Sequence, residues 1–218
     1  MNVNEKTIFE IFKKLKKSEL IEHLKSSFYE MDDRQRRDVF LELQNSVINK
    51  NLKPKELYPK ILEFHKKSIT GEYYAPFDIN SNNFMHIPNE TDEWFSELSY
   101  YLDETSKLVE KKEYGIANKC FEKLYESIEE MKDGEVVFAD EYGTWMISTK
   151  LDYDNFYIIS LSQTEDENKF AEKVVPLLRR DSYESLSSKI YSKIRKSANS
   201  KQFRKVQEEI KSKNIRIK

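Results

Sequence analysis

The sequence predicts an all-α protein of about nine or ten helices arranged as antiparallel hairpins, and three observations lead to that fold class. Turn-forming residues are rare, with four glycines and five prolines among 218 residues. Charged residues make up 35% of the chain and include many lysines and glutamates, which favour helix over sheet. Apolar residues recur with the 3.6-residue period of a helix along most of the chain.

Three amphipathic helices are expected in the first fifty residues or so. The first runs from Thr7 to Lys16, where apolar side chains recur at helical spacing. Ser18 suits the N-cap of the second helix, because its hydroxyl can accept a hydrogen bond from a backbone N–H of the first turn. Asp32 and Gln35 have the spacing of a capping box and predict the start of the third helix.

A fourth helix is expected between Pro54, which suits a first helical turn, and Gly71, which suits the position just past a helix end. The stretch 71–89 that follows is a first aromatic insert. Pro76 and Pro88 disfavour helix before them, yet the stretch is rich in apolar residues. We therefore expect an ordered loop that packs against helices or forms half of a binding site. Its apolar residues are Tyr73, Tyr74, Phe77, Ile79, Phe84, Met85 and Ile87.

A helical hairpin is expected after this insert. Thr91 is the predicted N-cap of its first helix, and the second helix starts near Tyr114. Spacings that resemble those of the tetratricopeptide (TPR) repeat are found at Leu108, Tyr114, Ala117, Phe121 and Leu124. Lys112 stands where that family prefers glycine, and Leu124 stands where it prefers alanine.

The resemblance to the TPR family covers about residues 98–131, which is one repeat length, and no second copy is found in register. It implies a TPR-like helical hairpin, and in that family such hairpins bind peptides or proteins on a concave face. An α-solenoid of TPR or HEAT type, or an irregular bundle of similar hairpins, is therefore the expected architecture. No binding residue is carried over from the family.

A second aromatic insert is expected at Val136–Ile147. It is either a short β-hairpin that bends at Tyr142–Gly143 or an extended loop that covers the preceding hairpin. Asp140 and Glu141 lie among aromatic residues, where carboxylates can have shifted pKa values and act as general acid and base. The alternative is an acidic loop tip that packs Phe138, Trp145 and Met146 inward.

The C-terminal third, residues 148–218, is expected to be helical. Helices are predicted to start at Asp154, near Thr164 with Glu167 completing a capping box, at Ser182 and at Ser200. Pro176 lies inside the second of these patterns and should kink it. Together with sub-regions 1–70 and 71–147, this region is expected to belong to one helical domain spanning residues 1–218.

Charge is unevenly distributed along the chain. Residues 72–142 hold 6 basic and 18 acidic side chains, whereas residues 189–218 hold 11 basic and 2 acidic ones. The basic end could follow a nucleic-acid backbone, although the sequence pI of about 6.1 argues against a general nucleic-acid binder. A solvated helix face or a clasp onto the acidic middle is the alternative. The candidate nucleic-acid contacts are Lys193, Arg195, Lys196, Lys201, Arg204 and Lys205.

The sequence contains no motif for several kinds of binding or catalytic chemistry. The three histidines, His23, His65 and His86, are widely separated, and Cys120 is the single cysteine, so neither a metal site nor a disulfide framework is expected. Four scattered glycines argue against a phosphate-binding loop, and we expect no cofactor. No apolar run approaches the length of a membrane span, and a cytoplasmic protein is expected.

The function expected from these observations is that of a non-enzymatic helical adaptor or regulatory module that binds a protein or peptide, preferably a basic one. Nucleic-acid binding through the C-terminus and an enzyme that uses Asp140 and Glu141 are the alternatives, and self-association is compatible with the charge polarity. The hypothetical partner-binding residues are Tyr73, Tyr74, Phe77, Asp140, Glu141, Tyr142 and Trp145.

Overall fold

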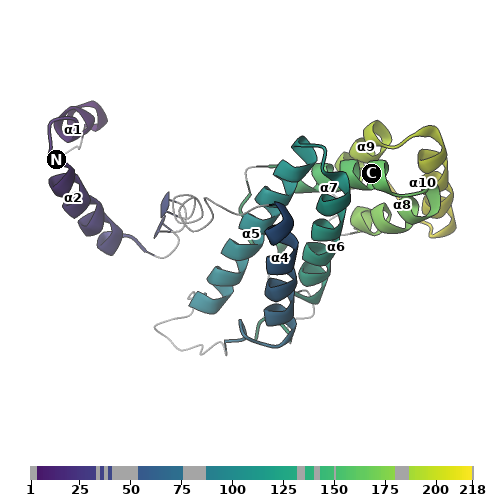
Figure 1. Ribbon diagram of the computed structural model, residues 1–218, viewed down its shortest axis with the longest axis horizontal. Helices are drawn as coiled ribbons and strands as arrows, with labels where there is room; N and C mark the ends of the chain where they lie inside the picture. Colours follow the sequence, from purple (N-terminus) through teal and green to yellow (C-terminus); the bar gives the residue numbers. More distant parts are fainter. Residues whose placement is uncertain are drawn as a thin grey trace. The chain divides into compact units, whose positions relative to one another are not determined.

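The computed structural model describes residues 4–32, 35–36, 39–40, 54–75, 87–131, 136–139, 143–149, 151–179 and 187–217. Within these residues the regular structure consists of nine α-helices and two short 3-10 helices, and none of them forms a strand (Figure 1). The all-α fold class predicted from the sequence is confirmed. Contacts along the chain divide it into two compact units, residues 1–51 and residues 52–218, and the expectation of one domain stays a prediction.

The N-terminal unit contains two described helices, α1 (Glu5–Phe12) and α2 (Lys17–Glu30). Asn4 caps α1 by accepting a hydrogen bond from the Thr7 N–H at 3.1 Å. The prediction that Ser18 caps α2 was wrong, since the N-cap is Lys16, whose backbone N–H donates to the Glu19 carboxylate at 2.7 Å. The Glu19 side chain, at the third helical position, thus satisfies the N–H of the N-cap residue, which is one half of a capping box.

The capping box predicted at Asp32 and Gln35 is confirmed. The Gln35 N–H donates to the Asp32 carboxylate at 2.8 Å, and the Asp32 N–H donates to the Gln35 side-chain oxygen at 3.0 Å. Most of the helix that this box was predicted to open lies outside the described residues. Neither α1 nor α2 contains a buried residue.

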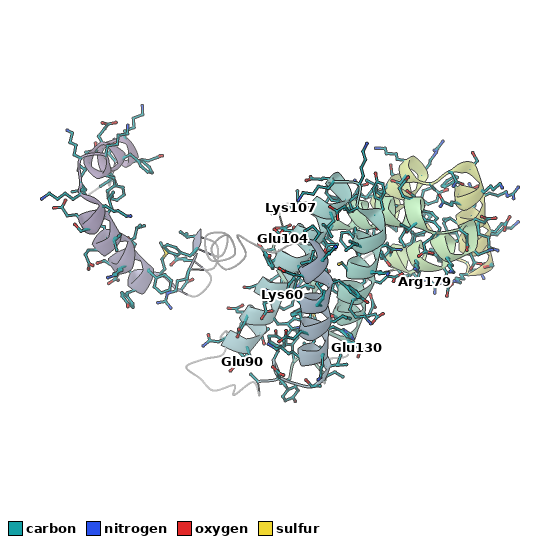
Figure 2. The ribbon with its side chains drawn as sticks, viewed as in Figure 1. Lys60, Glu90, Glu104, Lys107, Glu130 and Arg179 are labelled. Carbon is teal, nitrogen blue, oxygen red and sulfur yellow. The ribbon has the colours of Figure 1, made fainter. Side chains whose placement is uncertain are left out.

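The larger unit is built around α4 (Pro54–Ile69), α5 (Asn89–Glu110) and α6 (Tyr114–Met131), which pack against one another and lie side by side in Figure 1. Pro54 opens α4 as predicted, and the prediction that α6 begins near Tyr114 is confirmed. The three helices share one apolar core, whose fully buried members include Ile61, Phe64, Trp94, Leu98, Leu102, Phe121, Leu124 and Ile128. Their outer faces carry charged side chains such as Lys60, Glu90 and Glu130 (Figure 2).

The start of α5 differs from the prediction. Thr91 is 2% exposed and lies inside the first turn, while Pro88 occupies the N-cap position, and the Asp92 N–H donates to the Pro88 carbonyl at 3.1 Å. Proline has no N–H to leave unsatisfied and its φ is already suited to a helix entry, so the helix begins at Asn89.

The turn between α5 and α6 passes through the left-handed backbone region at Lys112, whose φ is 63°. The Lys112 N–H donates to the Val109 carbonyl, and the Glu113 N–H donates to the Leu108 carbonyl, both at 2.9 Å. These two bonds form a Schellman motif, in which glycine is the favoured residue at the left-handed position. Gly71, with φ 81°, follows the end of α4 as predicted, and the Glu72 N–H donates to the Lys67 carbonyl at 3.1 Å.

Five further elements complete the unit: α7 (Tyr153–Thr164), α8 (Glu167–Val174), η2 (Pro176–Arg179), α9 (Ser187–Ser197) and α10 (Ser200–Ser212). α7 packs against α5, α6 and α9, and α10 packs against α8. Pro176 was predicted to kink a continuous helix, but α8 ends at Val174 and Pro176 opens the separate 3-10 helix η2. Thr164 does not cap α8, because Asp166 accepts hydrogen bonds from the Asn168 and Lys169 N–H groups, both at 3.0 Å.

The second aromatic insert is described at residues 136–139 and 143–149. It contains the 3-10 helix η1 (Thr144–Met146) and no strand in those residues, so the described part does not form the β-hairpin that was one of the two alternatives. The consecutive residues Val137 and Phe138 are 0% and 1% exposed. A strand that covers one face of a helical hairpin would send these two side chains to opposite sides.

Candidate partner-binding surface

Both aromatic inserts contact one buried cluster centred on Trp94. The Trp94 ring lies 5.6 Å from that of Phe64 and 5.1 Å from that of Phe138, measured between ring centroids. Tyr73, from the first insert, lies 5.9 Å from Phe64, while Phe138, from the second insert, also stacks on Phe95 at 5.5 Å. Segments about sixty residues apart are therefore held against the same pair of helices, α4 and α5.

A hydrogen-bond chain fixes the orientation of the Trp94 ring in this cluster. The Trp94 indole N–H donates to the Ser68 hydroxyl at 2.7 Å, and that hydroxyl donates to the Phe64 carbonyl at 2.8 Å. Trp94 and Ser68 are both 0% exposed. Since each buried polar group has a partner, the ring is held without a desolvation penalty.

Tyr73 anchors the first insert and is itself 5% exposed, so its ring belongs to the core rather than to an accessible surface. Its hydroxyl donates to the Glu97 carboxylate at 2.9 Å. Burial raises the pKa of Tyr73 above its ordinary value, and the nearby Glu97 charge raises it further. Burial also raises the pKa of Glu97, and the Tyr73 hydrogen bond opposes that rise.

Two aromatic side chains that are near these anchors along the sequence are accessible. Tyr74, the residue after Tyr73, is 46% exposed, and Trp145, in η1, is 80% exposed. The Trp145 ring lies against Gly143 so closely that a Cβ at Gly143 would overlap it. One alternative predicted that Phe138, Trp145 and Met146 all pack inward. This is wrong for Trp145, whereas Phe138 is buried and Met146 is partly buried against the core.

Four of the seven hypothetical partner-binding residues, Phe77, Asp140, Glu141 and Tyr142, lie outside the described residues. The acid–base hypothesis for Asp140 and Glu141 therefore stays a hypothesis. The described residues on either side of Asp140–Tyr142 are anchored to α5, because Phe138 stacks on Phe95 and the Ser148 N–H donates to the Ser99 hydroxyl at 2.9 Å.

Carboxylates gather around Tyr73 on α4 and α5. Glu63 and Glu93 both raise the pKa of Glu97, while Lys67 lowers it. Lys67 is also paired with Glu63, at 3.4 Å. Glu63, Glu93 and Glu97 thus outnumber Lys67, the one cation that acts on Glu97, which gives this part of the molecule an excess of negative charge.

The side chains of His65 on α4 and of Glu126 and Ser127 on α6 are neighbours but do not form a hydrolytic triad. His65 Nδ1 is 2.9 Å from the Ser127 hydroxyl, and His65 Nε2 is 3.8 Å from Glu126. Ser127 is 0% exposed and its hydroxyl donates to the Lys123 carbonyl. A nucleophile needs access to its substrate, so this arrangement ties α4 to α6 instead. Burial lowers the pKa of His65, and Lys123 lowers it further.

Cys120 is fully buried, and burial raises the pKa of its thiol to about 12. A reactive cysteine needs the opposite shift, together with access to solvent. Within the described ranges no three histidine, cysteine, aspartate or glutamate side chains are grouped so that they could hold a metal ion.

The candidate nucleic-acid residues lie on α9 and α10, and three of the six are paired within the chain. Lys193 donates to Asp152 at 2.8 Å, and Lys205 lies 3.7 Å from Glu208 and 3.9 Å from Glu209. Arg204 lies 4.0 Å from Glu208 and is largely exposed. The other three, Arg195, Lys196 and Lys201, are exposed.

One polar network was missed by the sequence analysis. Lys173, on α8, donates to Glu122 on α6 and, at 2.7 Å, to Glu165 at the end of α7. The Asn118 amide donates to the same Glu165 carboxylate at 2.9 Å. The Gln202 amide, from α10, donates to the Glu165 carbonyl at 3.0 Å and to the Ser162 carbonyl at 3.1 Å. No spacing along the chain indicates this network, because its members come from four elements.

The search against family models, characterised proteins and solved structures gives no match for this chain. None of the helices formed by the described residues has both the length and the apolar character of a membrane span.

Proposed function

We propose that this protein is a non-enzymatic helical adaptor that binds a protein or peptide partner. The proposed binding surface consists of the exposed residues of the two aromatic inserts, whose buried residues belong to the Trp94 cluster. The single observation that carries the proposal is the anchoring of both inserts on this cluster, through Tyr73 and Phe138. Buried anchors hold the neighbouring residues in place before any partner arrives, which reduces the entropy that binding would cost.

Tyr74 and Trp145 supply the contact area in this proposal. Exposed tyrosine and tryptophan side chains are the residues that most often dominate binding energy at protein interfaces. Trp145, at 80% exposure, contributes almost its whole ring to the solvent-accessible surface. A TPR-like role for the α5–α6 hairpin agrees with this proposal, because that resemblance implies peptide binding.

A basic partner segment is favoured by the carboxylates near Tyr73. Glu63 and Glu93 raise the pKa of Glu97, and the neighbouring Lys67 lowers it. A lysine- or arginine-rich segment would reduce this repulsion on binding. Affinity for such a segment should fall as salt is raised.

Affinity capture from the native host tests the proposal. The full chain is immobilised as wild type, as Trp145→Ala and as Tyr29→Ala, the last being a control at another exposed aromatic residue (75%), on α2. We expect a stoichiometric partner on the wild type and on the control but not on Trp145→Ala. Absence of any partner at low and moderate salt, or equal capture by all three, would count against the proposal.

A second candidate is nucleic-acid binding through α9 and α10, and it is favoured by the exposure of Arg195, Lys196 and Lys201. We expect a mobility shift whose log affinity falls with log salt by about 0.7–0.9 per phosphate contacted. Replacing these three residues by alanine should remove the shift, whereas Lys193→Ala, which changes a paired lysine, should have a smaller effect. Binding that ignores salt would contradict this candidate.

A further inference from the structure

His65 lies in the contact between α4 and α6, beside charged side chains of α6. Its side chain is 16% exposed, and its ring lies between Ser127 and Glu126. The two helices pack against each other in the core of the larger unit. A change of charge on His65 therefore takes place inside a helix–helix contact.

The hydrogen bonds around the His65 ring determine which nitrogen carries the proton of the neutral form. The Ser127 hydroxyl has one hydrogen, which it donates to the Lys123 carbonyl at 3.1 Å. Nδ1, at 2.9 Å from the same hydroxyl oxygen, is therefore the donor in the bond between ring and hydroxyl. The neutral ring then has its lone pair on Nε2, which is 3.8 Å from the Glu126 carboxylate. Nε2 is consequently the atom that takes up a second proton.

Glu126 compensates a protonated ring only in part, because it is already paired. The Lys123 ammonium donates to the Glu126 carboxylate, so an imidazolium at His65 would share that carboxylate with an ammonium. Glu130, also on α6, is the other carboxylate that favours the protonated ring. Burial and the charge of Lys123 oppose protonation, and together they hold the pKa of His65 below its ordinary value of 6.5.

We propose that the α4–α6 contact at His65 is a proton-sensitive joint, which is intact while the ring is neutral and is weakened when Nε2 takes up a proton. The imidazolium and Lys123 then compete for Glu126 in a partly buried contact, where a cation without a full counter-charge is costly. The proposal concerns this contact alone and does not depend on the proposed function.

The direction of the pH effect follows from proton binding. Just below pH 6.5 the unfolded chain binds a proton at His65 more readily than the folded chain does, so stability falls as pH is lowered through this range. Well above pH 6.5 the ring is neutral in both states, and this contribution to the pH dependence vanishes.

Titration of the His65 ring by NMR in the full chain tests the proposal, with the signal assigned by its absence in His65→Gln. We expect a midpoint below 6.5 for the wild type. Lys123→Met should raise the midpoint, because it removes the opposing cation and frees Glu126, whereas Glu126→Gln should lower it. Lys107→Met, which breaks an ion pair on α5, is the control and should leave the midpoint unchanged.

Urea denaturation at about pH 7.5 and about pH 5.5 tests whether the proton weakens the joint. The wild type should lose more stability between these two pH values than His65→Gln, whose amide can still donate to the Ser127 hydroxyl but takes up no proton. A midpoint at or above 6.5, shifts in the same direction for Lys123→Met and Glu126→Gln, or equal losses for wild type and His65→Gln would overturn the proposal.

Discussion

Lys112 illustrates at the scale of one residue how hydrogen bonds hold a residue with a side chain in a backbone conformation that favours glycine. The TPR pattern prefers glycine at this position, and the structure places Lys112 in the left-handed backbone region, where a Cβ is unfavourable. The two hydrogen bonds of the Schellman motif hold that conformation. The position could be identified from the sequence, although its φ could not.

Lys112→Gly should raise the free energy of unfolding by about 0.5–1 kcal/mol, because it relieves the left-handed strain and the gain exceeds the added freedom of the unfolded chain. Urea denaturation of both proteins measures the change. Lys111→Gly is the matched control, because Lys111 has φ −80° and its replacement by glycine should not raise the free energy of unfolding. An unchanged or lower stability for Lys112→Gly would contradict the account of this turn.

Glu97 gives a second prediction at this scale, in the pH dependence of stability. Burial raises the pKa of Glu97 in the folded state above its unfolded value of about 4.5. The folded state therefore binds more protons between these two values, and Glu97 lowers stability as pH rises through that window. We expect the stability of Glu97→Gln relative to wild type to increase from pH 4 to pH 7, as measured by urea denaturation.

Tyr73→Phe is the companion variant. It removes the hydrogen bond that opposes the rise in the pKa of Glu97, so the pKa should rise further and stability at pH 7 should fall by about 1–2 kcal/mol. A Glu97→Gln variant whose stability difference from wild type is independent of pH would contradict the assignment.

At the scale of elements, periodicity located the helices better than it located their ends. Pro54, Gly71 and Tyr114 were placed correctly, because proline and glycine carry strong local preferences and a long apolar stripe defines a helix. The predicted caps at Ser18, Thr91 and Thr164 were wrong. In each case a neighbouring residue is the N-cap: Lys16 for α2, Pro88 for α5 and Asp166 for α8. Helix ends are uncertain by one or two residues when they are predicted from periodicity, because several residues within one turn can take the cap position.

The contacts between elements could not be predicted from the sequence. The contact that Lys173 makes between α8, α6 and the end of α7 can be tested by mutation. Lys173→Met should destabilise the protein by about 1–2 kcal/mol, because it leaves the partly buried Glu165 and Glu122 carboxylates without their ammonium partner. Lys107→Met is the control, since it breaks the more exposed Glu104–Lys107 pair on α5 (Figure 2) and should cost less than about 0.5 kcal/mol. Equal thermal-denaturation effects of the two variants would argue against a specific role for this network.

At the scale of the whole molecule, composition and periodicity were sufficient for the fold class. They also indicated that the two aromatic inserts pack onto helices, because so many apolar side chains could not all remain in solvent. They did not reveal that Tyr73 is an anchor while Tyr74 is accessible, since both belong to the same apolar stretch and only the position of α5 distinguishes them. The charge asymmetry was visible in the sequence, but the pairing of Lys193 with Asp152 depends on which helices are neighbours.

The dissociation constant of the captured partner, measured by titration calorimetry against the full chain, tests the central claim most directly. The account predicts that Trp145→Ala weakens binding by about 30-fold or more, as expected for loss of a dominant aromatic contact, and that raising salt weakens binding to the wild type. An affinity that stays within about twofold of wild type for Trp145→Ala would contradict the claim that this surface binds the partner.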